Sequence, residues 1–258
     1  LDLMIINLYP FEETTYKKNV DEKDVIENID IGGPSMIRAT AKNFNSKAII
    51  TDPNDYDNFI TELKENKCSV SNLTRRELAI KAFRKTAMYD STIHEYFSDS
   101  FDNKAIPEQL PIGLRKISSL RYGENPHQSA ALYTSGNKDS GLANATIHQG
   151  KELSYNNFLD TNTAMRCVME FDQPACVIVK HVNPCGVAIG TDLINAYQKS
   201  FATDPESAFG GVIAVNRLVD RAFASELINN QFLEVLIAPE YNQSALDVLK
   251  ERKNVRVI

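Results

Sequence analysis

The 258-residue sequence contains no tryptophan and only four cysteines, which are Cys68, Cys167, Cys176 and Cys185. The cysteines are scattered and none forms a CxxC pair, so they indicate neither a disulfide framework nor a zinc motif. A reducing cytoplasm is the expected compartment. No apolar run approaches the roughly 20 residues that span a bilayer, so no membrane partner is expected.

The sequence also lacks a basic excess, because 28 lysines and arginines stand against 34 aspartates and glutamates, for a net charge of −6. This balance argues against a nucleic-acid footprint and against attraction to an anionic membrane surface. The length fits one large or two modest domains. The chain opens at Leu1 and both of its ends read as apolar strands, so we expect it to be part of a longer protein.

Short apolar runs alternate with helical patterns, which predicts an α/β fold whose strands are buried on both sides. In the first part of the chain, strands are predicted at 3–8 and 48–50. Helices are predicted at 22–29, 34–42 and 55–64, and a long helix follows capping-box spacing at 74–77. A polar stretch with two prolines, residues 98–113, is the predicted linker.

After this linker the alternation resumes and predicts a second α/β unit with a mostly parallel sheet. Its predicted strands are 131–133, 175–179, 187–189, 211–215, 234–238 and 255–258. Its predicted helices are 160–171, 192–201, 219–230 and 243–252, and a polar hairpin is predicted at 134–146. The expected domains are residues 1–110, including linker, and residues 111–258.

Lys180 and His181 follow the apolar strand 175–179, and ligands of open α/β sheets bind beyond the carboxyl ends of strands. The two side chains converge only if the chain turns, and Asn183–Gly186 predicts that turn. A histidine can remove a proton from a weakly acidic amine, and a lysine can stabilise developing negative charge on oxygen. The alternative is an ordinary polar strand end, and spacing alone leaves both open.

The same loop contains a histidine and a cysteine, two residue types that bind zinc. Zinc deaminases use His-x-Glu followed by Pro-Cys-x-x-Cys. Here His181 is followed by Val182 and Asn183, and no second cysteine follows Cys185. No metal site is therefore predicted, and Cys185 is interpreted as a packed residue.

Two further segments are candidate sites. Gly32 and Gly33 precede a helix N-terminus, where free N–H groups bind an anion or a carbonyl oxygen; Asp30 and Lys42 lie nearby in sequence. The alternative is a tight turn with a solvated lysine. In Arg121–Gln128, an arginine suits phosphate or carboxylate and a tyrosine can stack on a heterocycle, although a plain polar loop has the same spacing.

Eight segments occur in an order that is more specific than any one of them. They are Asn7–Phe11, Ile29–Gly33, Ala41–Asn43, Leu120–Gln128, Leu153–Asn157, Lys180–Gly186, Ser207–Gly211 and Ile237–Pro239. The set resembles the bifunctional phosphoribosylaminoimidazolecarboxamide (AICAR) formyltransferase/IMP cyclohydrolase family over essentially the whole chain. The resemblance implies de novo purine biosynthesis, with formyl transfer from 10-formyltetrahydrofolate to AICAR, giving FAICAR, and ring closure of FAICAR to IMP.

The resemblance also implies a domain plan. Residues 1–110 match the C-terminal part of a methylglyoxal-synthase-like cyclohydrolase domain. Residues 111–258 match the first cytidine-deaminase-like α/β/α half of a formyltransferase without zinc. The family works as a homodimer in the cytoplasm, and its remaining segments supply further contacts and another catalytic lysine. This chain alone is therefore expected to have little activity.

Individual roles follow from the same resemblance. For formyl transfer, His181 matches the general base and Lys180 matches the group that stabilises the transition state. The matching nucleotide contacts are Arg121, Tyr122, Asn157, Gly210 and Glu234, the last at a position where an aspartate also occurs. For ring closure, the matching positions are Lys42 as proton donor and acceptor, Tyr9 and Asp30 at the formyl group, and Ile6, Asn7 and Ile31 at the nucleotide.

Two alternatives from other classes remain at this stage. The chain could be a nucleotide-binding module that keeps Arg121, Tyr122 and Asn157 without transforming its ligand. It could also be a zinc-dependent deaminase, which the missing glutamate and cysteine argue against.

Overall fold

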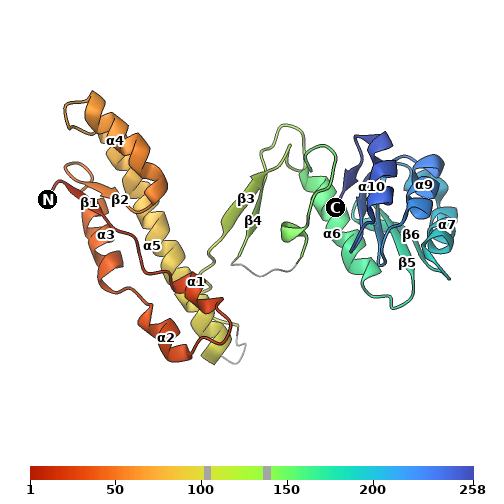
Figure 1. Cartoon of the computed structure of the whole chain (residues 1–258), viewed down its shortest axis with the longest axis horizontal. Helices are drawn as coiled ribbons and strands as arrows, with labels where there is room; N and C mark the ends of the chain where they lie inside the picture. The colour runs from red at the N-terminus through yellow and green to blue at the C-terminus, as the bar shows by residue number, and fades with distance from the viewer. Residues whose placement is uncertain (102–105, 136–140) are drawn as a thin grey trace. The chain divides into compact units, whose positions relative to one another are not determined.

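The computed structural model describes residues 1–101, 106–135 and 141–258, which form two compact units, Leu1–Leu114 and Arg115–Ile258 (Figure 1). The division therefore falls after residue 114, where the sequence had placed it after residue 110. Part of the expected linker is helical, because the long helix α5 spans Asn72–Phe101. In the described ranges, no helix is long and apolar enough to cross a membrane.

The first unit is built on a small parallel sheet of two strands, β1 (Leu3–Ile5) and β2 (Ala48–Ile50). Its helices are α1 (Phe11–Thr15), α2 (Glu22–Glu27), α3 (Gly32–Lys42), the short 3₁₀ turn η1 (Pro53–Asp55), α4 (Tyr56–Glu65) and α5. Successive strand residues point to opposite faces. Ile49 accordingly packs with α3 and α5, whereas Ile50 packs with α4 and α5.

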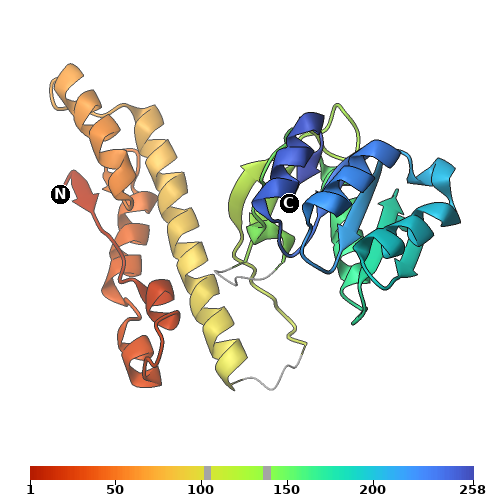
Figure 2. The ribbon, with the colours of Figure 1, turned by 45° about the vertical axis from the view of Figure 1, so that its right-hand side comes forward.

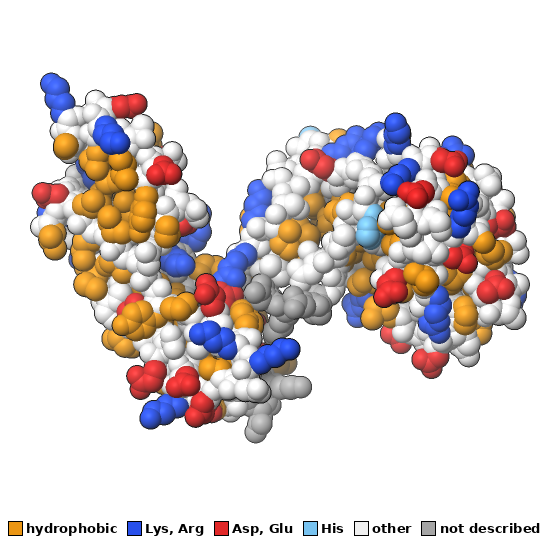
Figure 3. Space-filling model, in the orientation of Figure 1, with side chains coloured by type: hydrophobic (Ala, Val, Ile, Leu, Met, Phe, Trp, Pro, Cys, Tyr) orange, Lys and Arg blue, Asp and Glu red, His pale blue; other side chains and the backbone are white. Residues whose placement is uncertain are grey.

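Burial of this small sheet differs between its strands. All three residues of β2 are buried, as predicted, but Ile5 of β1 is 52% exposed. Figure 3 shows apolar side chains gathered on the face of this unit over β1, β2 and α3. The prediction that both strands are buried on both sides is therefore wrong for β1.

Several boundaries in the first unit also differ from prediction. The strand predicted at 3–8 ends at Ile5, and α5 begins earlier than the capping box at 74–77 implies. Ser71 takes the capping role, because its Oγ accepts the Thr74 N–H at 3.1 Å. Helix α1 was not predicted; Phe11, only 1% exposed, packs edge-on against Tyr89 and Tyr96 of α5.

The second unit contains a five-stranded sheet in the order β6-β5-β7-β8-β9. The strands are β5 (Ala175–Lys180), β6 (Asn183–Ile189), β7 (Gly211–Val215), β8 (Leu233–Ile237) and β9 (Arg256–Val257). Strand β5 pairs antiparallel with both β6 and β7, while β7, β8 and β9 run parallel. The predicted mostly parallel sheet is thus found for β6, β7, β8 and β9, which share one direction, but β5 runs against them. Two residues connect β5 to β6, and a connection this short permits only antiparallel pairing.

Helices cover both faces of this sheet, which gives three α/β/α layers (Figures 1 and 2). Helix α6 (Tyr155–Val168) packs against one face, where it meets Val177 and Val179. The other face carries Cys176 and Ile178 and is covered by α7 (Leu193–Thr203), α9 (Arg221–Asn230) and α10 (Gln243–Leu249). The short helix α8 (Pro205–Ala208) precedes β7, and the 3₁₀ turn η3 (Lys250–Arg252) follows α10.

Before α6, an antiparallel pair joins β3 (Arg115–Ser119) to β4 (Ala131–Thr134), with a bulge between Lys116 and Ser118. The observed hairpin therefore lies at 115–134. The hairpin predicted at 134–146 falls partly on residues 136–140, which are outside the described residues, and its described remainder holds only the 3₁₀ turn η2 (Leu142–Asn144).

Candidate functional site

The candidate site lies at the end of the sheet where β5 finishes and β7 and β8 begin. Lys180 is the last residue of β5, Gly210 directly precedes β7, and Glu234 is the second residue of β8. These positions meet because β5 runs against β7 and β8. The carboxyl-end rule therefore located Lys180, but Gly210 and Glu234 lie at the amino ends of their strands.

The turn that carries His181 is tighter than the sequence predicted. His181 and Val182 have φ values of 53° and 63°, and Lys180 pairs with Asn183 across the hairpin. This is the two-residue connection with both central residues at positive φ that antiparallel hairpins favour. The turn predicted at 183–186 is wrong, since those residues belong to β6. The Asn183 side chain closes the turn by donating to the His181 carbonyl at 2.8 Å.

Lys180 lies over the turn that leads into β7. Its Nζ donates to the Phe209 carbonyl at 2.5 Å, and the next residue, Gly210, has φ of 71°. A Cβ on Gly210 would lie 4.0 Å from Lys180 Nζ. An ammonium has three donors, and within the described residues the Phe209 carbonyl is the acceptor found for Lys180 Nζ, which leaves two N–H groups for a ligand. The exposed rings of Phe209 and Phe232 lie beside it with centroids 5.5 Å apart.

A network of charged and amide groups surrounds Glu234. Asn157 Nδ2 donates to Glu234 Oε2 at 2.9 Å, and Arg256 Nη1 lies 3.5 Å from the same oxygen. Arg256 is only 6% exposed, and its Nε donates to the carbonyls of Lys151 and Glu152 at 3.1 and 3.3 Å. Burial lowers the pKa of the Arg256 guanidinium, and the charge of Glu234 opposes that shift.

Asn157 is fixed by the start of α6. Ser154 Oγ accepts the Asn157 N–H at 3.2 Å, and Asn157 Oδ1 accepts the Ser154 N–H at 3.1 Å, which forms a reciprocal capping box. The capping box starts α6 at Tyr155, five residues before the predicted start. The Asn157 amide nitrogen is thereby directed at Glu234.

The loop after β3 attaches to the same helix start. The Arg121 N–H donates to the Leu153 carbonyl at 3.3 Å, and the Tyr155 N–H donates to the Tyr122 carbonyl at 3.2 Å. The exposed Arg121 guanidinium lies 5.4 Å from the Tyr122 ring centroid. The structure thus brings together Arg121, Tyr122, Asn157 and Glu234 beside the Lys180 end of the sheet.

Three residues at this site were not among the site residues predicted from the sequence. Arg256 carried a signal, because a charge inside the apolar run 255–258 needs a buried partner. Phe232 precedes a strand, and no sequence pattern marked it as a site residue. The third, Asp160, accepts the Val182 N–H at 2.7 Å. Burial raises the pKa of the Asp160 carboxyl, and the Val182 hydrogen bond and nearby His181 oppose that shift.

In the first unit, Asp30 joins two of the predicted positions. Its Oδ1 accepts the Gly33 N–H at 2.7 Å, and its Oδ2 accepts the Tyr9 N–H at 3.4 Å. Its own N–H donates to the Tyr89 hydroxyl at 2.8 Å. A Cβ on Gly33 would lie 2.5 Å from Asp30 Oδ2, so only glycine permits this approach.

The other predicted positions of this unit are spread out. Lys42 ends α3, whereas Asp30 precedes it, and an 11-residue helix separates its ends by roughly 15 Å. Asn7 Nδ2 donates to the Tyr56 hydroxyl at 3.2 Å, Ile31 is exposed, and the Ile6 N–H donates to the Ile50 carbonyl. The unit thus groups Tyr9 with Asp30 and leaves Lys42 at the far end of α3, and the role of each stays a prediction.

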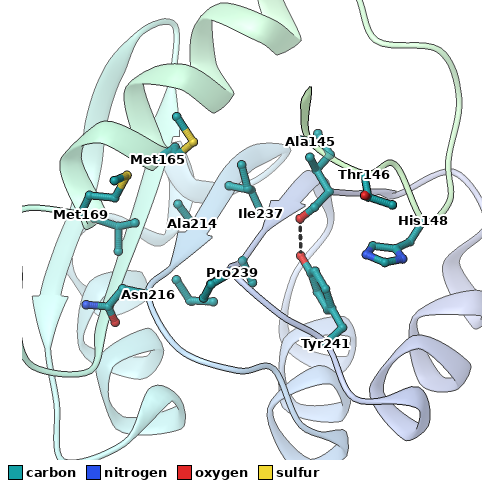
Figure 4. Close-up of a pocket in the computed structure, with 14 residues that line it drawn as sticks. Ala145, Thr146, His148, Met165, Met169, Ala214, Asn216, Ile237, Pro239 and Tyr241 are labelled. Atoms are coloured by element: carbon teal, nitrogen blue, oxygen red, sulfur yellow. Dashed lines mark hydrogen bonds between the residues drawn. The ribbon is translucent and has the colours of Figure 1, made fainter. Parts of the chain in front are cut away.

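A separate cavity of about 450 Å³ opens at the opposite end of β7 and β8 (Figure 4). Its lining is mainly apolar, and two of its polar side chains already bond to the protein. The Tyr241 hydroxyl donates to the carbonyls of Leu236 and Ile258, and the Asn216 amide donates to two carbonyls and accepts one N–H. A ligand site needs a few converging polar groups, so the Lys180 end is the better candidate.

Among residues 1–101, 106–135 and 141–258, no three His, Cys, Asp or Glu side chains form a group that could hold a metal ion. Cys185, the cysteine of the zinc-like loop, packs against the core beside α7, and its Sγ lies 3.5 Å from the Ile178 carbonyl. Burial raises the pKa of the Cys185 thiol. A packed, protonated thiol is a poor metal ligand.

Fold and site together define an α/β protein with a cluster of polar side chains, the candidate site, at one end of a mixed sheet. The family model described as the AICARFT/IMPCHase bienzyme matches residues 40–258, and the chain belongs to this family. Among solved structures, a crystal structure of ForH is 35% identical, with a TM-score of 0.35. That match covers 39% of this chain and 52% of the ForH chain, so this chain matches about half the length of that protein.

Proposed function

We propose that residues 115–258 carry part of a formyltransferase site that transfers a formyl group from 10-formyltetrahydrofolate to AICAR, in purine biosynthesis. The proposal rests on the convergence of the predicted site residues at one end of the five-stranded sheet. Residues far apart in sequence, from Arg121 to Glu234, meet at one end of one sheet beside Lys180 and His181. Membership of the bienzyme family supports the same reaction class.

In the proposed reaction the 5-amino group of AICAR attacks the formyl carbon. His181 takes a proton from the amine as the new C–N bond forms, and Lys180 stabilises the charge that develops on the formyl oxygen. The bond from the formyl carbon to N10 of the folate then breaks, and N10 receives a proton. Lys180 keeps two donors for this role while its third holds the Phe209 carbonyl.

The remaining side chains are assigned to binding. Arg121 is suited to the phosphate or carboxamide of the nucleotide, and Tyr122 offers a flat face for stacking. Asn157 presents an amide, and Glu234 presents a carboxylate that Asn157 and Arg256 hold in place. The exposed rings of Phe209 and Phe232 lie next to Lys180, where a conjugated co-substrate would approach.

For the first unit we propose part of the cyclohydrolase that closes FAICAR to IMP. The amide nitrogen attacks the formyl carbon, and water leaves. The Tyr9, Asp30 and Gly33 cluster offers a carboxylate beside a helix N-terminus at one end of α3, which suits a polarised carbonyl. Lys42 is proposed to act at the other end, and we propose that the protein works as a cytoplasmic homodimer.

The test of the formyltransferase proposal is binding, because the sequence predicts little turnover by this chain alone. Calorimetry with AICAR should show saturable binding to the 258-residue chain. Glu234→Gln and Arg121→Met should each weaken it about tenfold, the loss expected when one charged contact of roughly 1.4 kcal/mol is removed. Lys250→Met, which removes an exposed ion pair with Asp247 and none of the proposed site residues, is the control.

Either of two results would overturn this assignment. The first is an absence of AICAR binding at millimolar concentration. The second is equal affinity in the Glu234 and Arg121 variants and the wild type. A His181→Ala variant that binds AICAR as the wild type does, yet loses the transfer seen with the wild type, would separate catalysis from a nucleotide-binding module.

A further inference from the structure

We propose that Asp160 is a positioning residue that holds the His181–Val182 turn in its left-handed conformation and so directs His181 into the site. The role of His181 as a base rests on the proposed function. The support of the turn by Asp160 rests on geometry alone. Asp160 lies outside the motif positions that match the family's site residues.

The turn needs support because of the residues it contains. Positive φ places the Cβ of an L-residue close to the following carbonyl, and it is least favourable for a β-branched residue. Val182 is β-branched and has φ of 63°, and His181 before it has φ of 53°. Such a conformation persists only where surrounding contacts hold it, and strained backbone of this kind clusters at functional sites.

Asp160 supplies that contact from a different element. Its Oδ1 accepts the Val182 N–H at 2.7 Å, a short distance typical of a charge-assisted hydrogen bond. The His181 N–H also faces the carboxylate. Asp160 lies three residues after Asn157 on α6, so the two side chains share one face of that helix. One helix face therefore holds Glu234 and the base-bearing turn together.

The groups around Asp160 act on its carboxyl in opposite directions. Burial raises the pKa of Asp160, and the negative charge of Glu234 across the site raises it further, while the Val182 and His181 groups lower it. Burial therefore opposes ionisation of the Asp160 carboxyl, and the N–H groups of the turn favour its charged form.

The test compares Asp160→Ala, Asp160→Asn and the double variant Asp160→Ala/Val182→Gly in the 258-residue chain. The first readout is the intraresidue amide–Hα NOE of His181, which is strong only at positive φ and needs no activity. The second is the single-turnover rate of formyl transfer. Asp192→Ala, which removes a helix cap away from the site, is the control for general destabilisation.

The positioning role predicts a distinct pattern across these variants. Asp160→Ala should weaken the NOE and slow transfer about tenfold, as expected for loss of a hydrogen bond to a charged acceptor. Asp160→Asn should keep the NOE, because its amide oxygen can still accept the Val182 N–H. The double variant should recover both readouts, since glycine adopts positive φ without strain.

An unchanged NOE and rate in Asp160→Ala would overturn the proposal, as would failure of Val182→Gly to restore the turn. If Asp160→Ala does not fold, folding of the double variant supports the role and its failure to fold overturns it. A wild-type chain that shows the positive-φ NOE but does not bind AICAR would sink the proposed function and leave the positioning role intact.

Discussion

At the scale of the residue, the buried guanidinium of Arg256 organises one side of the candidate site. It contacts Glu234 and two backbone carbonyls, which compensate a charge removed from water. Arg256→Met should lower the free energy of unfolding by about 1.5–3 kcal/mol, because these charged hydrogen bonds are lost. Urea denaturation measures this loss.

The matched control for Arg256 is Lys250→Met. Lys250 pairs with Asp247 on the surface, where both side chains are more than half exposed. Exposed pairs contribute little, so this change should stay within about 0.5 kcal/mol of the wild type. Equal losses in the two variants would show that the Arg256 network is not a stabilising element.

Gly210 combines a backbone requirement with proximity to the proposed catalytic lysine. Gly210→Ala should lower stability by about 1 kcal/mol, because φ of 71° is unfavourable for alanine. It should also weaken AICAR binding, since the new methyl group would lie 4.0 Å from Lys180 Nζ. Gly141→Ala is the control: φ is 92° there and nothing lies within 4 Å of the added carbon. Binding should be unchanged in that control.

The pKa of Asp160 makes a prediction about pH. Its folded pKa is raised above the ordinary value of 3.8 by burial. Between these two pKa values the folded state binds more protons than the unfolded state, so the Asp160 contribution to stability falls as pH rises through that window. Asp160→Asn should therefore stabilise the fold at pH 7 relative to the wild type and lose this advantage near pH 3. Thermal unfolding at both pH values measures it, and an advantage independent of pH would contradict it.

At the scale of the element, the start of α6 serves both the fold and the site. Ser154→Ala removes one half of the capping box and should cost about 1 kcal/mol. It should also weaken AICAR binding, because Asn157 loses the Ser154 hydroxyl, one of the two groups that fix it. Asn242→Ala removes the cap of α10, whose Oδ1 accepts the Ala245 N–H at 2.8 Å.

The two cap variants separate stability from function. Both should lower the midpoint of thermal unfolding by a similar amount, but only Ser154→Ala should change the affinity for AICAR. If calorimetry found equal affinities in the two variants, the capping box would be a structural feature with no part in binding.

The hairpin of β5 and β6 shows what local patterns leave open. The apolar run of β5 was predicted correctly because an uninterrupted buried strand has a clear signature. The direction of its neighbours was not predicted correctly, because a run of apolar residues does not show whether adjacent strands pair parallel or antiparallel. The turn was misplaced because Asn183–Gly186 has typical turn residues, whereas Val182, which occupies the real turn, does not.

At the scale of the whole molecule, the second unit has the features of a domain that folds by itself. Its sheet is covered on both faces by apolar clusters, and the chain divides at residue 114. Residues 115–258 expressed alone should unfold cooperatively, with a midpoint close to that of one transition in the full chain. Calorimetry tests this, and a broad transition without a heat-absorption peak would contradict it.

Residues 1–114 are expected to be less stable in isolation. Their sheet has only two strands, and two-stranded sheets are marginal without further packing. A single cooperative transition for the full chain, with neither part folding alone, would show instead that the two units depend on each other.

Much of this protein was determined by its sequence alone. The α/β class, most of the buried strands and the membership of the bienzyme family rest on apolar runs and ordered motifs, and these are local properties. Each motif was visible because its residues are neighbours in the chain. The same locality explains why these motifs do not show how they meet in space.

The tertiary structure decided the arrangement of the site. Strand direction placed Gly210 and Glu234 beside Lys180, because β5 runs against β7 and β8. Long-range contacts brought Arg256 to Glu234 and Asp160 to Val182, and these pairs are separated by about 22 residues along the chain. No periodicity records such pairings, since each depends on burial and on the free energy of many contacts at once.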